Sequence, residues 1–110
     1  MEIHVTGKPN FSENFKKGLA LAKGRRLTSQ IDQALDNVFV TVYSMTRPVG
    51  RFVFEKISTK NEGTDVKEKP ELHYWLRKSH IIERDYNPLE FAVAELVRYG
   101  KSRKIKSIVL

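Results

Sequence analysis

The sequence predicts a single small α+β domain, spanning residues 1–110, with a central antiparallel β-hairpin, about four helices and short terminal strands. The chain has 110 residues, the length of one domain, and 40% of them are hydrophobic, close to the average for globular proteins. Segment 38–45 is almost entirely β-branched or aromatic, and 51–58 has a similar character after a turn. Apolar residues elsewhere recur at helical spacing.

The first helix is expected after a short strand at 2–6 and a turn. Asn10 and Glu13 have the spacing of a capping box, and apolar residues follow at helical intervals. Gly24 is positioned to end this helix in a left-handed conformation. Gly18, inside the helix, costs up to about 1 kcal/mol relative to alanine, which hints at close packing there.

A second helix is expected to begin at Thr28 or Ser29, with Ile31 and Leu35 on its inner side. Two helices around a glycine turn are also the arrangement of a DNA-binding helix-turn-helix motif. That motif would bury several charged or polar side chains of 16–35, at a cost of several kcal/mol. An ordinary helical hairpin is therefore favoured.

The β-hairpin of 38–45 and 51–58 is the strongest structural prediction, because a proline-glycine turn separates two strand-like runs. The first strand is expected to be buried on both faces. Phe52 and Phe54 share one face of the second strand, where aromatic rings can stack on bases, as in RNA-binding sheets. Alternating aromatic residues in a central hairpin usually face inward, so we expect both in the core.

The last part of the chain is expected to hold a mobile polar loop at 59–69, two helices and a closing strand. Segment 70–82 starts with a proline, which favours a helix over the alternative of a strand. The last helix should begin at Asn87, a capping residue, and end at Gly100. Segment 105–110 is expected to form a strand at the edge of a sheet.

The net charge of +7 is concentrated toward the two ends of the chain. Residues 1–31 contain six Lys or Arg and two acidic residues, and residues 96–110 contain five Lys or Arg and no acidic residue. If the chain ends meet in the fold, these cations share one face, which suits a polyanion. The candidate nucleic-acid-binding residues are Lys23, Arg25, Arg26, Arg47, Arg51, Arg98, Tyr99, Lys101, Arg103, Lys104 and Lys106. Tyr99 is included because its ring can stack on a base.

This pattern predicts a nucleic-acid-binding accessory protein that contacts the phosphate backbone of DNA or RNA. An alternative is a protein-interaction module, such as a small inhibitor or adaptor from a virus or mobile element, whose basic face meets an acidic protein. A further alternative is a small metal-independent ribonuclease, in which His73 and His80 on one helix face act as general base and general acid. Binding is favoured over catalysis.

Other classes of function lack support in the sequence. The chain has no cysteine, which excludes disulfides, cysteine zinc ligands and thiol nucleophiles. No nucleotide-binding or hydrolase motif and no metal-ligand spacing is present, so no cofactor or metal is expected. We expect a soluble, cytoplasmic protein with no membrane partner, since no segment resembles a signal or a membrane span. An exposed terminal strand would allow a homodimer.

Overall fold

The structure is a computed structural model that describes residues 1–57 and 72–110. Its elements, in chain order, are β1 (Glu2–His4), α1 (Glu13–Lys23), β2 (Leu27–Ala34), β3 (Asn37–Ser44), β4 (Arg47–Ile57), β5 (Leu72–Ile81), α2 (Leu89–Ser102) and β6 (Ile105–Val109). The α+β class is confirmed, but the described residues form two helices where about four were expected. The predicted loop at 59–69 lies outside the described residues.

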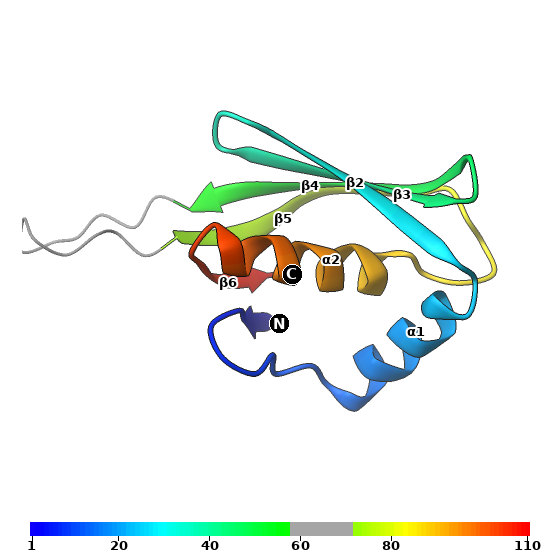
Figure 1. Cartoon of the computed structure of the whole chain (residues 1–110), viewed down its shortest axis with the longest axis horizontal. Coiled ribbons are helices and arrows are strands. Elements are labelled where there is room, and N and C mark those ends of the chain that lie inside the picture. The colour runs from blue at the N-terminus through cyan, green and yellow to red at the C-terminus, as the bar shows by residue number, and fades with distance from the viewer. Residues whose placement is uncertain (58–71) are drawn as a thin grey trace, which may run out of the picture.

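The six strands form one sheet in the order β1-β6-β5-β4-β3-β2. Neighbouring strands are antiparallel, except that β5 and β6 run parallel. Both helices lie on the same side of the sheet: α2 packs directly against it, and α1 packs against α2 (Figure 1). The opposite face of the sheet carries no helix among the described residues, and we call it the helix-free face.

The predicted hairpin is confirmed as β3 and β4, but the predicted turn at 47–50 is wrong, because these residues begin β4 and the turn lies at 45–46. Val38, Val40 and Val42 of β3 point toward α2 and are fully buried, as are Phe52 and Phe54 of β4. The expectation that both faces of the first strand are buried is wrong, because the residues between the valines point to the helix-free face. The core therefore lies between α2 and one face of the sheet.

Helix α1 confirms the first predicted helix and its end at Gly24, although a different residue caps its start. Ser12, not Asn10, caps the helix, and its hydroxyl oxygen accepts a hydrogen bond of 3.2 Å from the backbone N–H of Phe15. Gly24 ends the helix in a right-handed conformation, with φ of −64°. The left-handed residue is Arg26, whose φ is +54°.

The close packing expected at Gly18 is present between the two helices. A Cβ atom at Gly18 would lie 2.8 Å from the Glu90 carboxylate of α2. One oxygen of that carboxylate is buried without a hydrogen-bond partner among the described residues. The helices thus approach each other at a position where α1 has no side chain.

The second predicted helix is wrong, since Leu27–Ala34 forms the strand β2. The helix-turn-helix alternative needs this helix and is therefore wrong as well. Ile31 lies within the strand, partly buried against the core. Leu35, expected on the inner side of a helix, is 94% exposed in the turn between β2 and β3. The eight-residue ladder with β3 supplies the backbone hydrogen bonds that a helix would have made.

The helix expected at 70–82 is also wrong, because Leu72–Ile81 forms β5. Its first residues, Pro70 included, lie outside the described part of the chain. Tyr74 is buried while its neighbour Trp75 is exposed, which is the alternation of a strand. The alternative interpretation of this segment, a strand, is therefore correct.

Helix α2 confirms the last predicted helix. The Asn87 side-chain oxygen accepts a 3.0 Å hydrogen bond from the N–H of Leu89, the first helical residue. Gly100 lies inside the helix and does not end it. A Cβ atom at Gly100 would lie 3.1 Å from Cβ of Ile105, so the glycine lets the helix approach β6 closely.

The chain ends meet, because β1 pairs with β6. The backbone N–H of Leu110 donates a 2.8 Å hydrogen bond to the carbonyl of Met1. Strand β6 itself lies between β1 and β5, so the expected edge position of the last strand is wrong. The last strand therefore has no free edge at which to pair with a second copy. Among the described residues, no helix is long and apolar enough to cross a membrane.

Candidate functional site

One group of the predicted cations surrounds Glu83, beyond the end of β5. Arg47, the first residue of β4, places its guanidinium 3.1 Å from the Glu83 carboxylate. The guanidinium of Arg25 lies 5.4 Å from the ring centroid of Tyr86. Backbone N–H groups of Asp85 and Arg84 lower the pKa of Glu83, and the charges of Arg47 and Arg25 act in the same direction. This group is partly neutralised by its own acid.

A second group lies at the C-terminal end of α2 and in the turn before β6. It contains Lys101, Arg103 and Lys104, all of which are exposed. Arg103 lies over the ring of Tyr99, 5.2 Å from its centroid. Arg98 pairs with Glu95 one turn away on α2, at 3.2 Å.

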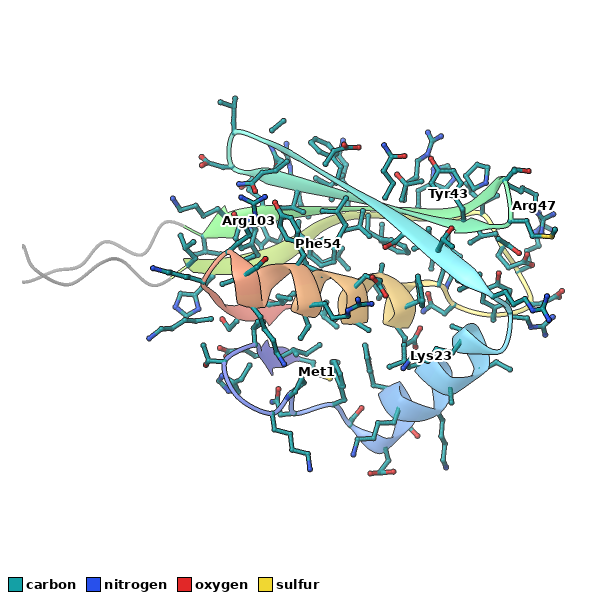
Figure 2. All side chains as sticks on the ribbon, viewed as in Figure 1. Met1, Lys23, Tyr43, Arg47, Phe54 and Arg103 are labelled. Atoms are coloured by element: carbon teal, nitrogen blue, oxygen red, sulfur yellow. The ribbon has the colours of Figure 1, made fainter. Side chains whose placement is uncertain are left out.

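These two groups do not form one patch. Figure 2 shows Arg47 at one end of the long axis and Arg103 toward the other end. Lys23 and Arg26 belong to the end of α1 and the turn that follows it, and Lys23 lies away from Arg103 in the same view. The chain ends meet, but the basic clusters do not come together, so that expectation is wrong. The reason is that Arg103 follows the C-terminal end of α2, whereas Arg47 lies at the start of β4, toward the opposite end of the molecule.

The remaining predicted cations lie on the sheet. Lys106 of β6 is an extra residue in the pairing with β5, where Leu72 pairs with Ile105 and His73 with Ser107. Arg51 of β4 lies on the helix-free face, since the neighbouring Phe52 faces α2. Arg51 is therefore separated from both helix-end groups.

His73 and His80 do not form a common site. Both belong to β5, and seven residues of a strand span about 20 Å. The His73 ring forms a hydrogen bond with the hydroxyl of Ser107, and His80 pairs with Arg51 across the sheet. Acid and base must both reach one phosphodiester, and this separation is too large for that. Nothing in the arrangement supports the ribonuclease.

The helix-free face carries aromatic side chains that the sequence analysis did not single out. Phe39 of β3 and Trp75 of β5 are each 39% exposed on this face, although they are large apolar residues. Strand β4 lies between them and contributes Val53, which pairs with Phe39. Tyr43 lies further along β3 on the same face and is partly exposed. The face thus has an aromatic surface that crosses three strands.

Cations lie beside these rings. Lys78 pairs with Val53, and Arg51 pairs with His80, so both cations lie on the helix-free face. A β-bulge in β5 makes Arg77 an extra residue, and its guanidinium lies 3.2 Å from the Glu55 carboxylate. Among the residues described, neither Arg51 nor Lys78 has an ion-pair partner. Two positive charges without an ion-pair partner therefore flank the aromatic surface, on a face that also carries Asp32 opposite Phe39 and Glu55 opposite Trp75.

Recognition of the alternation of apolar and polar residues in β5 would have revealed this face. In 72–81, Leu72, Tyr74 and Leu76 alternate with polar residues and Trp75. The same residues also fit helical spacing, because Leu72, Trp75 and Leu76 are three and four apart. A helix over 70–82 puts Trp75 on the same side as Leu72 and Leu76, and this interpretation conceals that its ring is exposed.

A pocket of about 240 Å³ lies beside the Glu83 group, lined by the first residues of β4 and by the segment after β5. This volume is below the roughly 300–1,000 Å³ typical of small-molecule sites. Within 1–57 and 72–110, no three acids or histidines are arranged to hold a metal ion.

Comparison of the chain with known proteins identified no relative. No protein-family model, no curated protein and no solved structure matches the chain. The candidate site therefore depends on the chemistry of the helix-free face alone.

Proposed function

We propose that the protein binds single-stranded nucleic acid on the helix-free face of the sheet. One observation carries this proposal: Phe39 and Trp75 project from the same face, on either side of β4, beside the unpaired cations Arg51 and Lys78. Exposed aromatic rings stack on unpaired bases, and adjacent cations attract the phosphates that join them. Both parts of a single-strand site are therefore present on one surface.

Single strands fit this surface better than duplexes. Bases in a duplex are stacked on one another, so their flat faces are not available to protein rings. A duplex bound to the cations would leave Phe39 and Trp75 exposed to water. The net charge of +7 attracts any nucleic acid, and the rings supply the preference for unpaired bases.

Fluorescence titration tests the role of the rings. Trp75 is the only tryptophan of the chain, so its emission reports stacking directly. Phe39→Ala and Trp75→Ala should each weaken binding of a labelled single-stranded oligonucleotide by about 1–3 kcal/mol. Leu21→Ala is the matched control, since Leu21 is an exposed apolar residue of α1, on the helix side of the molecule. Unchanged affinity in both ring variants would exclude this site.

The salt dependence of binding tests the role of the cations. If Arg51 and Lys78 neutralise two phosphates, log K should fall with log salt at a slope of about −1.4 for single strands. Arg51→Ala and Lys78→Ala should each reduce that slope by about 0.7. Lys17→Ala removes an exposed cation of α1 and should affect the slope little. A slope near zero would contradict nucleic-acid binding altogether.

A second candidate is a protein-interaction module that uses the same face. Val53 is partly exposed beside Phe39, with Lys78 opposite it on β5, so the surface combines apolar side chains with a neighbouring cation. An acidic protein with an exposed apolar patch would be complementary to it. A partner retained after nuclease treatment would favour this candidate, and a partner lost after nuclease treatment would favour nucleic acid.

A further inference from the structure

The two edges of the sheet differ in whether another strand can join them. At β1, the side chain of Asn10 occupies the edge: its oxygen accepts a 2.7 Å hydrogen bond from the N–H of His4, and its nitrogen donates a 3.1 Å hydrogen bond to the carbonyl of Glu2. These are the backbone groups that a further strand would use. The short β1 edge is therefore blocked by a side chain.

The β2 edge has little of the usual protection, since Asp32 is its one charged residue. Strand β2 has eight residues in unbroken register with β3, and Leu27–Ala34 contains no proline, no lysine and no bulge. Such features, or a covering segment, are what proteins use to prevent pairing at an edge. In the described part of the chain, no backbone hydrogen bond from outside the β2–β3 ladder reaches this strand. Strand β2 is thus available for pairing.

The hairpin turn determines which backbone groups point outward. A two-residue turn, Leu35 and Asp36, joins β2 to β3 and is closed by the pair Ala34–Asn37. In such a hairpin the closing pair is hydrogen-bonded, and hydrogen-bonded pairs then alternate with non-bonded ones. The N–H and C=O groups of Ser29, Ile31 and Gln33 therefore point away from β3.

We propose that β2 pairs antiparallel with β2 of a second copy of this chain, with Ile31 on the twofold axis. Ile31 then exchanges two hydrogen bonds with Ile31 of the second copy, and the outward groups of Ser29 and Gln33 bond each other across the axis. The partly buried Ile31 side chain gains an apolar neighbour. Each copy keeps its helices on the same side of the joined sheet.

Side-chain complementarity selects this register. The outward-pointing backbone groups of β2 can pair with those of a second copy when the twofold axis passes through residue 30, 31 or 32. An axis at Asp32 would place two carboxylates opposite each other, which is unfavourable. An axis at Ile31 places Gln30 opposite Asp32 of the second copy, twice, so that the amide can donate to the carboxylate. These two residues already form a 3.3 Å hydrogen bond within one copy, on the helix-free face.

The blocked edge limits the assembly to two copies. A protein with two open edges can add copies without end, whereas one open edge permits only a closed pair. Because the sheet continues across the axis, the helix-free faces of the two copies become one surface. The pairing does not depend on nucleic-acid binding.

Two substitutions at one exposed position test the pairing. Gln30→Lys places a cation opposite Asp32 of the second copy and should strengthen the dimer by about 2- to 30-fold, while Gln30→Asp places two carboxylates together and should weaken it by a similar factor. Sedimentation velocity over a concentration series measures both, and circular dichroism confirms that each variant is folded. The side chain of Gln30 is exposed, so neither change disturbs the core.

The outcomes are distinct. Strengthening by lysine together with weakening by aspartate supports the register centred on Ile31. Weakening by both overturns this register, because like charges would then meet at an axis on residue 30. Equal dimerisation in both variants, or a wild-type protein that stays monomeric throughout the series, overturns the proposal. In the monomeric case, the open edge would instead accept a strand of another protein.

Discussion

The hydroxyl of Tyr99 donates a hydrogen bond of 2.5 Å to the side-chain oxygen of Gln33 and so joins α2 to β2. The Tyr99 ring also carries the guanidinium of Arg103 above it. A residue expected from the sequence to stack on a base is thus engaged within the protein. Its contacts hold the last turns of α2 against the strand at the open edge.

Tyr99→Phe should lower the free energy of unfolding by about 0.5–1.5 kcal/mol, because it removes one hydrogen bond and leaves the ring in place. Urea denaturation measures the change. Tyr86→Phe is the control, since the ring of Tyr86 contacts Arg25 and its hydroxyl has no hydrogen bond within the described residues. Equal effects of the two substitutions would show that the Tyr99 bond contributes nothing.

Phe54→Ala and Phe39→Ala should have very different effects on stability. Phe54 is fully buried against α2, and its removal should cost about 3–5 kcal/mol. Phe39 points to the helix-free face and is 39% exposed, so its removal should cost about 1 kcal/mol or less. Thermal denaturation of both variants measures the difference. A large loss for Phe39→Ala would mean that this face is covered in solution.

Gly50→Ala should destabilise the protein by about 1–3 kcal/mol. The added Cβ would lie 2.7 Å from the ring of Pro88 and 3.0 Å from the ring of Phe52, and neither rigid group can move easily. Gly24→Ala provides the contrast, because its backbone is right-handed and its nearest neighbour lies 3.5 Å away. That substitution should stabilise the protein by about 0.4–1 kcal/mol. Chemical denaturation of the two variants checks both signs.

Glu83→Gln should reduce stability at neutral pH and lose its effect in acid. The pKa of Glu83 lies below its ordinary value, chiefly because two backbone N–H groups donate to its carboxylate. A lowered pKa means that the stabilisation is present above the unfolded value and is lost as the pH falls through the folded value. Denaturation of the wild-type protein and of Glu83→Gln at several pH values measures whether their free energies of unfolding become equal as the pH falls. A constant difference down to the lowest pH would contradict it.

Asn10→Ala should expose the β1 edge. The substitution removes both hydrogen bonds between the Asn10 side chain and the β1 backbone, at a cost of about 1–3 kcal/mol. With two open edges, the protein should form species larger than a dimer in sedimentation velocity. Thr6→Ala, at an exposed position nearby, should leave the size distribution unchanged. A folded variant with unchanged size would show that Asn10 does not protect this edge.

The sequence was most informative where local preference and packing agree. The run around Val40 is β-branched and also packs against α2, so β3 could be predicted with its partner β4. The apolar residues at helical spacing similarly identify α1, although its cap is Ser12 and not the expected Asn10, and Asn87 identifies the start of α2. In these segments the residue types admit only one regular structure.

Strands β2 and β5 could not be predicted because their local signals favour another structure. Thr28 and Ser29 are good helix caps, but their segment pairs along its whole length with β3, a contact made only after the chain folds. In β5, the bulge at Arg77 interrupts the alternation on which strand recognition depends. Non-local pairing decides both segments, and one sequence does not display it.

The candidate site was missed for the same reason. Counts of charge drew attention to Lys101 and Arg103, which are close in sequence. The helix-free face instead gathers Phe39, Arg51 and Trp75 from three different strands. Their proximity depends on strand order and register, so it becomes visible only once the sheet is assembled.

The bulge at Arg77 also affects how the length of this protein can vary. Leu76 and Lys78 occupy successive regular positions opposite β4, and Arg77 is the additional residue between them. Deletion of Arg77 would therefore leave all the remaining side chains of β5 on their present faces of the sheet. Deletion of Trp75 would instead move the residues before it to the opposite face. Position 77 is the place where this strand can lose an amino acid and keep its orientation.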